Sequence, residues 1–393
     1  MKQTPAAPVW RKAAVVGSLW ASAEIVLGSF LHNIGVPVTG TILASIGVCL
    51  LVASHQVWPE EGLFWRAGLI CAVMKSISPS SVILGAMIGI LIESLLVEGA
   101  VRLFGRNTAA YVAGGAAAVS FTLIQTIVLL IFTYGTNIVE LYSRFYQIAA
   151  SGFGIRTIRA GEFILLLFAA DIVIGVLAAA SGIAIGRRAA RAPDRRAGSE
   201  TLARGSASLP SVNPATRFSI AWLAFHALVI IGGMLSFSLL PLWGAASILS
   251  AYFAVCIARY PLSLHRLAKP GLWIEFAVVA LLASFLLGNL QSREPGWSWS
   301  GLAVGTEMNL RAALIVVGFS VVSVEVRNPK IIGWFIRRGM SEFSAALNIA
   351  FEALPAMTAA LVQGRRFISH PFAAIPDAIR SANDWLRAYE KEA

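Results

Sequence analysis

The stretch Arg187–Arg217 reads RRAARAPDRRAGSETLARGSASLPSVNPATR and separates two long apolar parts of the chain. It holds seven arginines and three prolines but only two acidic residues. Such a segment has too little apolar surface to repay the entropy of ordering, so the sequence predicts a solvated linker. Because short basic loops stay on the cytoplasmic side of a membrane, we expect the linker to lie there.

The composition on either side of this stretch is that of a membrane protein. Of the 393 residues, 57% are hydrophobic and only 13% are charged, and the mean hydropathy is +0.75. Soluble domains carry about 25% charged residues. Repeated apolar runs of about 17–25 residues therefore predict an all-α polytopic membrane protein. The net charge of +11 lies mostly between these runs, so we expect the lipid bilayer, and not nucleic acid, as the partner of the basic residues.

The apolar runs predict about ten transmembrane helices in a six-plus-four arrangement. Residues 1–186 form a first membrane domain, 187–217 the linker, and 218–393 a second membrane domain. The expected crossings are about 13–31, 35–54, 62–76, 78–103, 109–133 and 161–186, then 218–239, 242–258, 271–289 and 310–325. An amphipathic stretch at 137–154 is expected to lie on the membrane surface or to line a vestibule.

The last part of the chain is helical in pattern but more polar. Residues 343–361 contain Glu352 and Pro355, so we expect an amphipathic cytoplasmic or interfacial helix there rather than a fifth crossing. The tail 377–391 presents an apolar face suited to a membrane surface or a partner. Counting crossings against the basic loops places the N-terminus, the linker and the C-terminus in the cytoplasm.

The sequence lacks the common nucleotide-binding, metalloprotease and serine-hydrolase motifs. It contains no GxxxxGK[ST], HExxH or GxSxG, and Cys49, Cys71 and Cys256 stand far apart in apolar sequence. We therefore expect no catalytic residues, no metal ion and no cofactor. The sequence favours a membrane subunit that is not an enzyme.

Polar residues inside or at the ends of the apolar runs are the candidate binding residues, because such groups are expensive in a bilayer unless they face a cavity or a partner. A set of donors, acceptors and charges at the outer mouth of the first block suits a small polar molecule. We predict that the substrate-binding residues are Asn33, Lys75, Ser78, Glu93, Tyr134 and Asn137. The alternative is that Lys75 forms a buried pair with a glutamate that holds the helix bundle together.

A row of small residues, Ala13, Gly17 and Ala21, marks one face of the first helix. Spacing of four lets another helix approach closely. The row therefore predicts a helix interface, either with a partner protein or by ordinary packing inside the same bundle.

Two segments of the second block carry a family resemblance. They are MNLRAALIVVGFSVVSVE (Met308–Glu325) and RRGMSEFSAALNIAFEALPAMTAAL (Arg337–Leu361), a last membrane helix followed by an amphipathic helix with a Leu-Pro step. This succession resembles the transmembrane coupling (T) component of energy-coupling factor (ECF) transporters. The six-helix first block, with its small-residue first helix, resembles the substrate-binding (S) component of the same family.

The resemblance implies uptake of a small organic, vitamin-like nutrient by a fused S-like and T-like chain. It also implies cytoplasmic coupling helices at the C-terminus and paired ABC-type ATPase subunits as partners. Arg337, Arg338, Arg365 and Arg366 resemble the Ala-Arg-Gly signatures that contact those ATPases in the family.

Two other functions remain open from the sequence. A self-contained secondary carrier would use Glu24, Asp171 or Glu93 to bind a proton. A membrane-embedded lipid-modifying enzyme would need an acidic or histidine cluster at the cytoplasmic face, for which the loop HQVWPEE (His55–Glu61) is the candidate.

Overall fold

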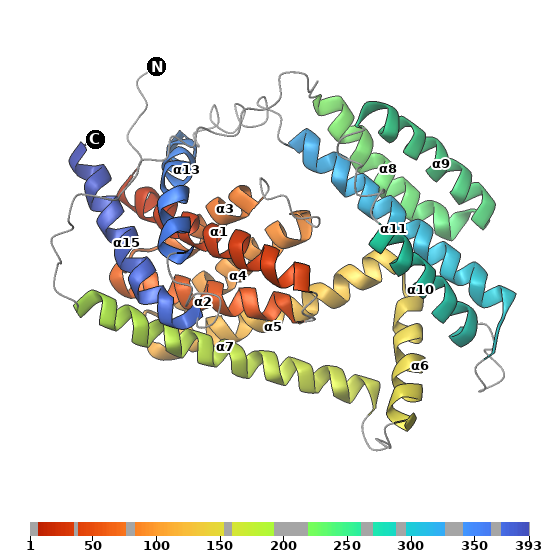
Figure 1. The fold of residues 1–393 in the computed structure, drawn as a ribbon, viewed down its shortest axis with the longest axis horizontal. Helices are drawn as coiled ribbons and strands as arrows, with labels where there is room; N and C mark the ends of the chain where they lie inside the picture. Colours follow the sequence, from red (N-terminus) through yellow and green to blue (C-terminus); the bar gives the residue numbers. More distant parts are fainter. Residues whose placement is uncertain are drawn as a thin grey trace. The chain divides into compact units, whose positions relative to one another are not determined.

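The computed structural model describes residues 7–34, 38–75, 83–152, 159–191, 219–260, 270–287, 296–326, 341–362 and 371–392 (Figure 1). Within these ranges the chain forms thirteen helices and no strand. The all-helical prediction is therefore confirmed for the described residues. Most of the Arg187–Arg217 linker lies outside them.

The helices follow the expected segments closely. Their bounds are α1 Pro8–Ile34, α2 Thr39–Val57, α3 Leu63–Lys75, α4 Ile83–Phe104, α5 Thr108–Tyr134, α6 Asn137–Gly152, α7 Ala160–Arg191, α8 Ile220–Leu239, α9 Leu242–Arg259, α10 Pro270–Leu286, α11 Trp299–Val326, α13 Ser341–Val362 and α15 Pro371–Glu392.

Some helix bounds differ from the prediction, and α1, for example, begins at Pro8, before the expected position 13. Helix α7 continues to Arg191, into the start of the expected linker. Helix α11 begins at Trp299, well before the expected position 310. At its start the Ser298 hydroxyl accepts a hydrogen bond from the backbone N–H of Gly301 at 3.5 Å, in the geometry of an N-cap.

Seven of the described helices are long and apolar enough to cross a membrane. They are α2, α5, α7, α8, α9, α11 and α13, and α10 contains a shorter apolar stretch. Large apolar side chains such as Leu165, Leu177, Leu228 and Leu235 are exposed along α7 and α8. A water-soluble surface rarely exposes so much apolar area, so these helices indicate a multi-pass membrane protein. Helix α13, expected at the interface, also has the length and composition of a crossing.

The helices group into two compact units. Unit 1 comprises residues 1–125, 167–214 and 333–393, and unit 2 comprises residues 126–166 and 215–332. This grouping differs from the expected domains, because the helices of the C-terminal tail pack with the first part of the chain. The tail follows unit 2 in sequence but contributes its apolar faces to the core of unit 1.

Helix α1 is the centre of unit 1. It packs against α2, α3, α13 and α15, and the side chains from Ala13 to Ala23 are all buried. Figure 1 shows α13 and α15, the last two helices of the chain, lying alongside α1. Small side chains dominate the buried stretch of α1, which lets several helices approach its backbone at once.

Close backbone contact also joins α7 to α5 in unit 1. A side chain at Gly175 would place its Cβ 2.4 Å from the carbonyl oxygen of Gly115, and a side chain at Gly115 would meet the Gly175 carbonyl oxygen at 2.8 Å. Only glycine at both positions permits this approach. The contact fixes α7 along the bundle of unit 1.

Unit 2 is built around α11, which packs against α8, α9 and α10. One apolar cluster joins α8, α9 and α11 and includes Leu249, Leu314 and Val317. A second cluster joins α6 to α10 and α11 and includes Leu141, Leu286 and Met308. The two clusters cover different faces of α11, so this helix holds the unit together.

The tight contact between α1 and α3 gives a testable prediction. A Cβ at Gly17 would lie 2.8 Å from the Ala67 carbonyl oxygen, whereas a Cβ at Gly99 of α4 would meet nothing within 4 Å. We expect Gly17→Ala to destabilise the protein by about 1–3 kcal/mol through overpacking. Gly99→Ala should leave stability unchanged or raise it slightly, because alanine favours helix. Thermal unfolding of both purified variants checks this, and equal stability of the two would contradict the packing of α1 on α3.

Candidate functional site

A buried ion pair joins α1 to α3 in unit 1. Lys75 is the last residue of α3, and its Nζ donates to Glu24 Oε2 and to the Glu24 carbonyl oxygen, both at 3.0 Å. Both residues are only 5% exposed. Gly28 lies one turn further along α1, and a Cβ there would come within 3.2 Å of the Lys75 ammonium. Glycine at this position therefore leaves room for the charged group beside the α1 backbone.

A second buried carboxylate lies near this pair. Glu93 of α4 is 7% exposed and is close enough to interact electrostatically with Glu24. The buried thiol of Cys71 lies among all three charged side chains. Among the described residues Glu93 has no hydrogen-bond or ion-pair partner. Among the described residues Lys75 thus pairs with Glu24 and not with Glu93, and a buried carboxyl group such as Glu93 is stabilised either by a proton or by a cationic group.

The structure brings only part of the predicted binding set together. Lys75 and Glu93 lie in unit 1 close to Glu24, and Asn33 is in the last turn of α1, although its side chain is not described. Ser78 lies outside the described residues. Tyr134 and Asn137 belong to unit 2, where Tyr134 packs against the cluster that contains Leu141.

Sequence reasoning left Glu24 out of the predicted binding set, although it is the residue that holds Lys75. An acidic residue inside the first apolar run is a visible signal, because a buried lysine needs an anionic partner. The helix positions needed to pair it with Lys75 depend on how α1 and α3 cross, and the sequence does not contain that information.

Two other polar contacts inside the apolar helices of unit 1 join neighbouring helices. Thr41 Oγ1 donates to Asp171 Oδ1 at 3.1 Å, which joins α2 to α7. Gln125 Nε2 donates to the Gly85 carbonyl oxygen at 2.6 Å, which joins α5 to α4. These contacts fasten neighbouring helices to one another.

The small-residue row of α1 is used inside unit 1. Ala13 and Ala21 are fully buried, and Gly17 lies against Ala67 and Ile70 of α3. The structure therefore places the row in the α1–α3 contact. The predicted ATPase-contacting residues Arg337, Arg338, Arg365 and Arg366 lie outside the described residues.

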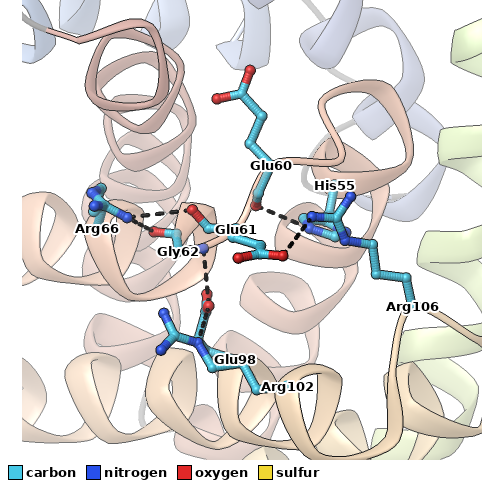
Figure 2. Close-up of polar contacts among 8 residues, drawn as sticks. All are labelled: His55, Glu60, Glu61, Gly62, Arg66, Glu98, Arg102 and Arg106. Atoms are coloured by element: carbon cyan, nitrogen blue, oxygen red, sulfur yellow. Dashed lines mark hydrogen bonds and ion pairs between the residues drawn. The ribbon is translucent and has the colours of Figure 1, made fainter.

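A second polar cluster surrounds the loop between α2 and α3 (Figure 2). His55 Nε2 donates to the Glu60 carbonyl oxygen at 3.2 Å, which leaves Nδ1 to accept from the Tyr111 hydroxyl at 2.8 Å. The His55 ring also stacks on Phe64 with ring centroids 4.5 Å apart. Because both ring nitrogens are engaged, His55 is held as a structural residue and neither nitrogen is open to act as a base.

Glu98 of α4 fixes the same loop from the other side. Its Oε1 accepts from the backbone N–H of Gly62 at 2.9 Å and from Arg102 Nε at 2.8 Å. Gly62 has a φ of +79°, a conformation that favours glycine. Figure 2 shows Glu98 beneath the loop, with Arg66 reaching the loop carbonyls of Glu61 and Gly62.

The remaining charges of this cluster are paired as well. Arg106 contacts Glu61 at 3.4 Å, and Lys12 of α1 pairs with Glu60. Arg66 also lies over the rings of Trp65 and Trp10, with distances of 4.5 and 5.1 Å from Cζ to the ring centroids. The loop that sequence analysis offered as an enzyme site is thus a clamp between helices.

The fold and these two clusters define the class of the protein: a multi-pass helical membrane protein with charged groups buried between its helices. Comparison of the chain with known protein families, with curated proteins and with solved structures gives no match.

The buried pair predicts a strong asymmetry between single and double variants. Lys75→Met leaves Glu24 buried without its cation and should cost about 3–5 kcal/mol. Combining it with Glu24→Gln removes both charges, so most of that loss should be recovered. Thermal unfolding in detergent measures both effects. A single variant as stable as the double would show that Glu24 does not depend on Lys75.

The contacts of the loop between α2 and α3 predict that Glu98 contributes more to stability than its partner Arg102. Glu98→Ala removes the acceptor of the Gly62 N–H inside the protein, so we expect a loss of about 1–3 kcal/mol. Arg102→Ala is the matched control, because 60% of the Arg102 side chain is exposed and exposed pairs contribute little. Faster proteolysis of the 58–62 loop in Glu98→Ala alone would confirm the clamp. Equal behaviour of the two variants would contradict it.

Proposed function

We propose that the chain is the membrane part of an ECF-type uptake transporter. Residues 1–186 capture a small organic, vitamin-like nutrient, and residues 218–393 couple this capture to paired ABC-type ATPase subunits. In this proposal the chain itself is not an enzyme. It lies in the inner membrane of a bacterial cell with about ten crossings, and the N-terminus, the linker and the C-terminus are cytoplasmic.

The packing of the C-terminal helices on α1 carries the proposal. Trp10 packs against Phe343 with ring centroids 5.8 Å apart, and Thr358 Oγ1 donates to Ser22 Oγ at 3.1 Å. These contacts join the start of α1 to the start of α13 and a later turn to a later turn, so the two helices run parallel. Helix α13, which follows the second block in sequence, thereby packs along α1, the first helix of the proposed substrate-binding block.

Helix α15 also packs against α1. Its apolar face is buried in the core of unit 1 and consists of Ile375, Ala378, Ile379, Ala382, Trp385 and Leu386. Near its end Glu390 pairs with Arg11 of α1 at 3.4 Å. Movement imposed on the tail would therefore be passed directly to α1, as coupling helices require.

The buried Lys75–Glu24 pair and Glu93 form the centre of the proposed ligand site. Asn33, in the last turn of α1, and Ser78, which follows α3 closely in sequence, are retained as its polar rim. The Glu93 carboxyl group, which has no partner among the described residues, favours a substrate with a cationic or strongly hydrogen-bond-donating group. Tyr134 and Asn137 remain predicted members of the site.

Co-purification tests the coupling. The chain, tagged and expressed in its own cell, should bring down a pair of ATPases that carry the P-loop motif. Arg337→Glu combined with Arg338→Glu should reduce their recovery at least tenfold, because the reversed charge would repel the surface that the arginines contact. The variant must remain in the membrane and monodisperse.

Arg380→Glu provides the matched control for this experiment. Arg380 also lies on the C-terminal tail, and its partially exposed side chain pairs only weakly with Asp377. It should leave ATPase recovery unchanged. Normal recovery with the double variant would show that the tail arginines are not the contact, and absence of ATPases from the wild type would contradict the ECF-type proposal.

One observation favours the self-contained carrier as a second candidate. Glu93 is buried without a cation among the described residues, as expected of a carboxylate that binds and releases a proton. In that case an uncoupler, and not depletion of ATP, would abolish uptake. Glu93→Gln would then abolish uptake even where no ATPase is bound.

A further inference from the structure

Unit 2 contains a buried polar network that the proposed function does not use. It joins the first turns of α8 to the last turns of α9 and α11. His226 of α8 is 0% exposed and Glu325 of α11 is 1% exposed. Tyr252 and Tyr260, on α9 and directly after it, lie between them. Ionisable residues in this setting are costly and mark proton or ligand pathways in membrane proteins.

The contacts form a single continuous chain of hydrogen bonds. His226 Nδ1 lies 3.1 Å from the Tyr252 hydroxyl, and Nε2 lies 3.3 Å from the Tyr260 hydroxyl. The Tyr260 hydroxyl in turn donates to Glu325 Oε1. The order Tyr252, His226, Tyr260, Glu325 therefore runs across all three helices without a break.

The Glu325 carboxylate at the end of this series of hydrogen bonds determines which group donates in each bond. A carboxylate only accepts, so Tyr260 donates its proton to Glu325 and receives the Nε2–H of His226. His226 Nδ1 is then the acceptor for the Tyr252 hydroxyl. Every donor in the chain points towards Glu325, and each group from Tyr252 to Glu325 can accept a proton at the atom that its neighbour contacts.

Charged and titratable groups from the neighbouring helices surround this series of hydrogen bonds. Glu325 Oε2 also accepts from the Ser219 backbone N–H at 2.8 Å. From α9, Arg259 donates its Nε to the Tyr260 oxygen at 3.1 Å and lies 4.5 Å from the centroid of the Trp222 ring of α8. The Cys256 thiol hydrogen-bonds to the Tyr252 hydroxyl. Arg259 thus offsets the charge of Glu325.

The two ends of this hydrogen-bond chain have different surroundings, and the Tyr260 end is suited to proton transfer. Burial and the hydrogen bond to Glu325 raise the pKa of Tyr260 to about 12, so this hydroxyl keeps a proton to donate. At the other end Tyr252, together with Ser236, lines a cavity of about 10 Å³, the size of roughly one water molecule. The hydrogen-bond chain therefore begins beside a small cavity lined mostly by apolar side chains and ends at a carboxylate.

We infer that Tyr252, His226, Tyr260 and Glu325 form a proton-binding site in which Glu325 is loaded through the tyrosines and the histidine.

The transfer balances in protons. A proton arriving at the Tyr252 oxygen is matched by passage of the Tyr252 proton to His226 Nδ1. His226 gives its Nε2 proton to Tyr260, and Tyr260 gives its own to Glu325. The product is neutral Glu325 with a neutral His226 in the other tautomer, and one proton has been taken up. Loss of the carboxylate charge would weaken its bonds to Ser219 and Tyr260, and so loosen the contact of α11 with α8 and α9.

Infrared spectroscopy of the full chain in lipid nanodiscs tests this inference. Acidification should produce the C=O stretching band of a protonated carboxyl group, and Glu325→Gln should remove one such band. Tyr260→Phe keeps the ring but removes the hydrogen bond to the carboxylate, so the pH midpoint of this band should rise by about one unit or more. After a rapid drop in pH, the band should form at least tenfold more slowly in Tyr260→Phe and in His226→Gln.

His55→Gln is the control for these variants. His55 also contacts a tyrosine hydroxyl, but in unit 1, so its replacement should change neither the midpoint nor the rate of the Glu325 band. If Glu325→Gln does not fold, Glu325→Asp identifies the band by a shift of its frequency. A spectrum unaffected by either Glu325 variant would overturn the site. Unchanged midpoint and rate in Tyr260→Phe and His226→Gln would show that the network only fastens three helices.

Discussion

The close packing around α1 is the constraint on which unit 1 depends. A helix in lipid gains little from hiding apolar side chains, because the lipid is equally apolar, so association depends on how closely backbones approach. The stretch from Ala13 to Ala23 is buried, with alanine, serine and glycine at most of its positions. This lets α3 contact Gly17 at van der Waals distance while α13 meets the Trp10 and Ser22 positions. A larger residue would have to displace a neighbouring helix.

Polar groups then specify which helix meets which. The Lys75–Glu24 pair sets the position of α3 along α1, and the Gly62–Glu98 bond sets the loop before α3 against α4. In unit 2 the Tyr260–Glu325 bond does the same for α9 and α11. These interactions contribute little net stability compared with an apolar core, but a slipped arrangement would leave each of these groups unpaired in a poorly solvated place.

Much of the fold could be predicted from the sequence because apolar runs, glycines and basic loops report directly on helix positions. The exceptions have physical causes. The start of α11 was missed because Glu307 made the segment before residue 310 look polar, whereas it pairs with Arg311 at 2.8 Å along one face of the helix. The grouping of α13 and α15 with unit 1 could not be predicted, because an amphipathic pattern shows that a helix face is buried but not which surface it packs against. The alternative interpretation of Lys75, a buried pair with a glutamate, is confirmed, but naming Glu24 as that glutamate required knowledge of how α1 crosses α3.

The two buried polar centres differ in the kind of function they can support. Near Lys75, the carboxyl group of Glu93 has no partner among the described residues, and a ligand or a proton can supply one. Around Glu325 the charge of Arg259 offsets the carboxylate, and the hydrogen bonds are ordered in one direction. A centre that lacks a partner is suited to capture, whereas a balanced and directed chain is suited to transfer. The two centres lie in separate units, one in unit 1 and the other in unit 2.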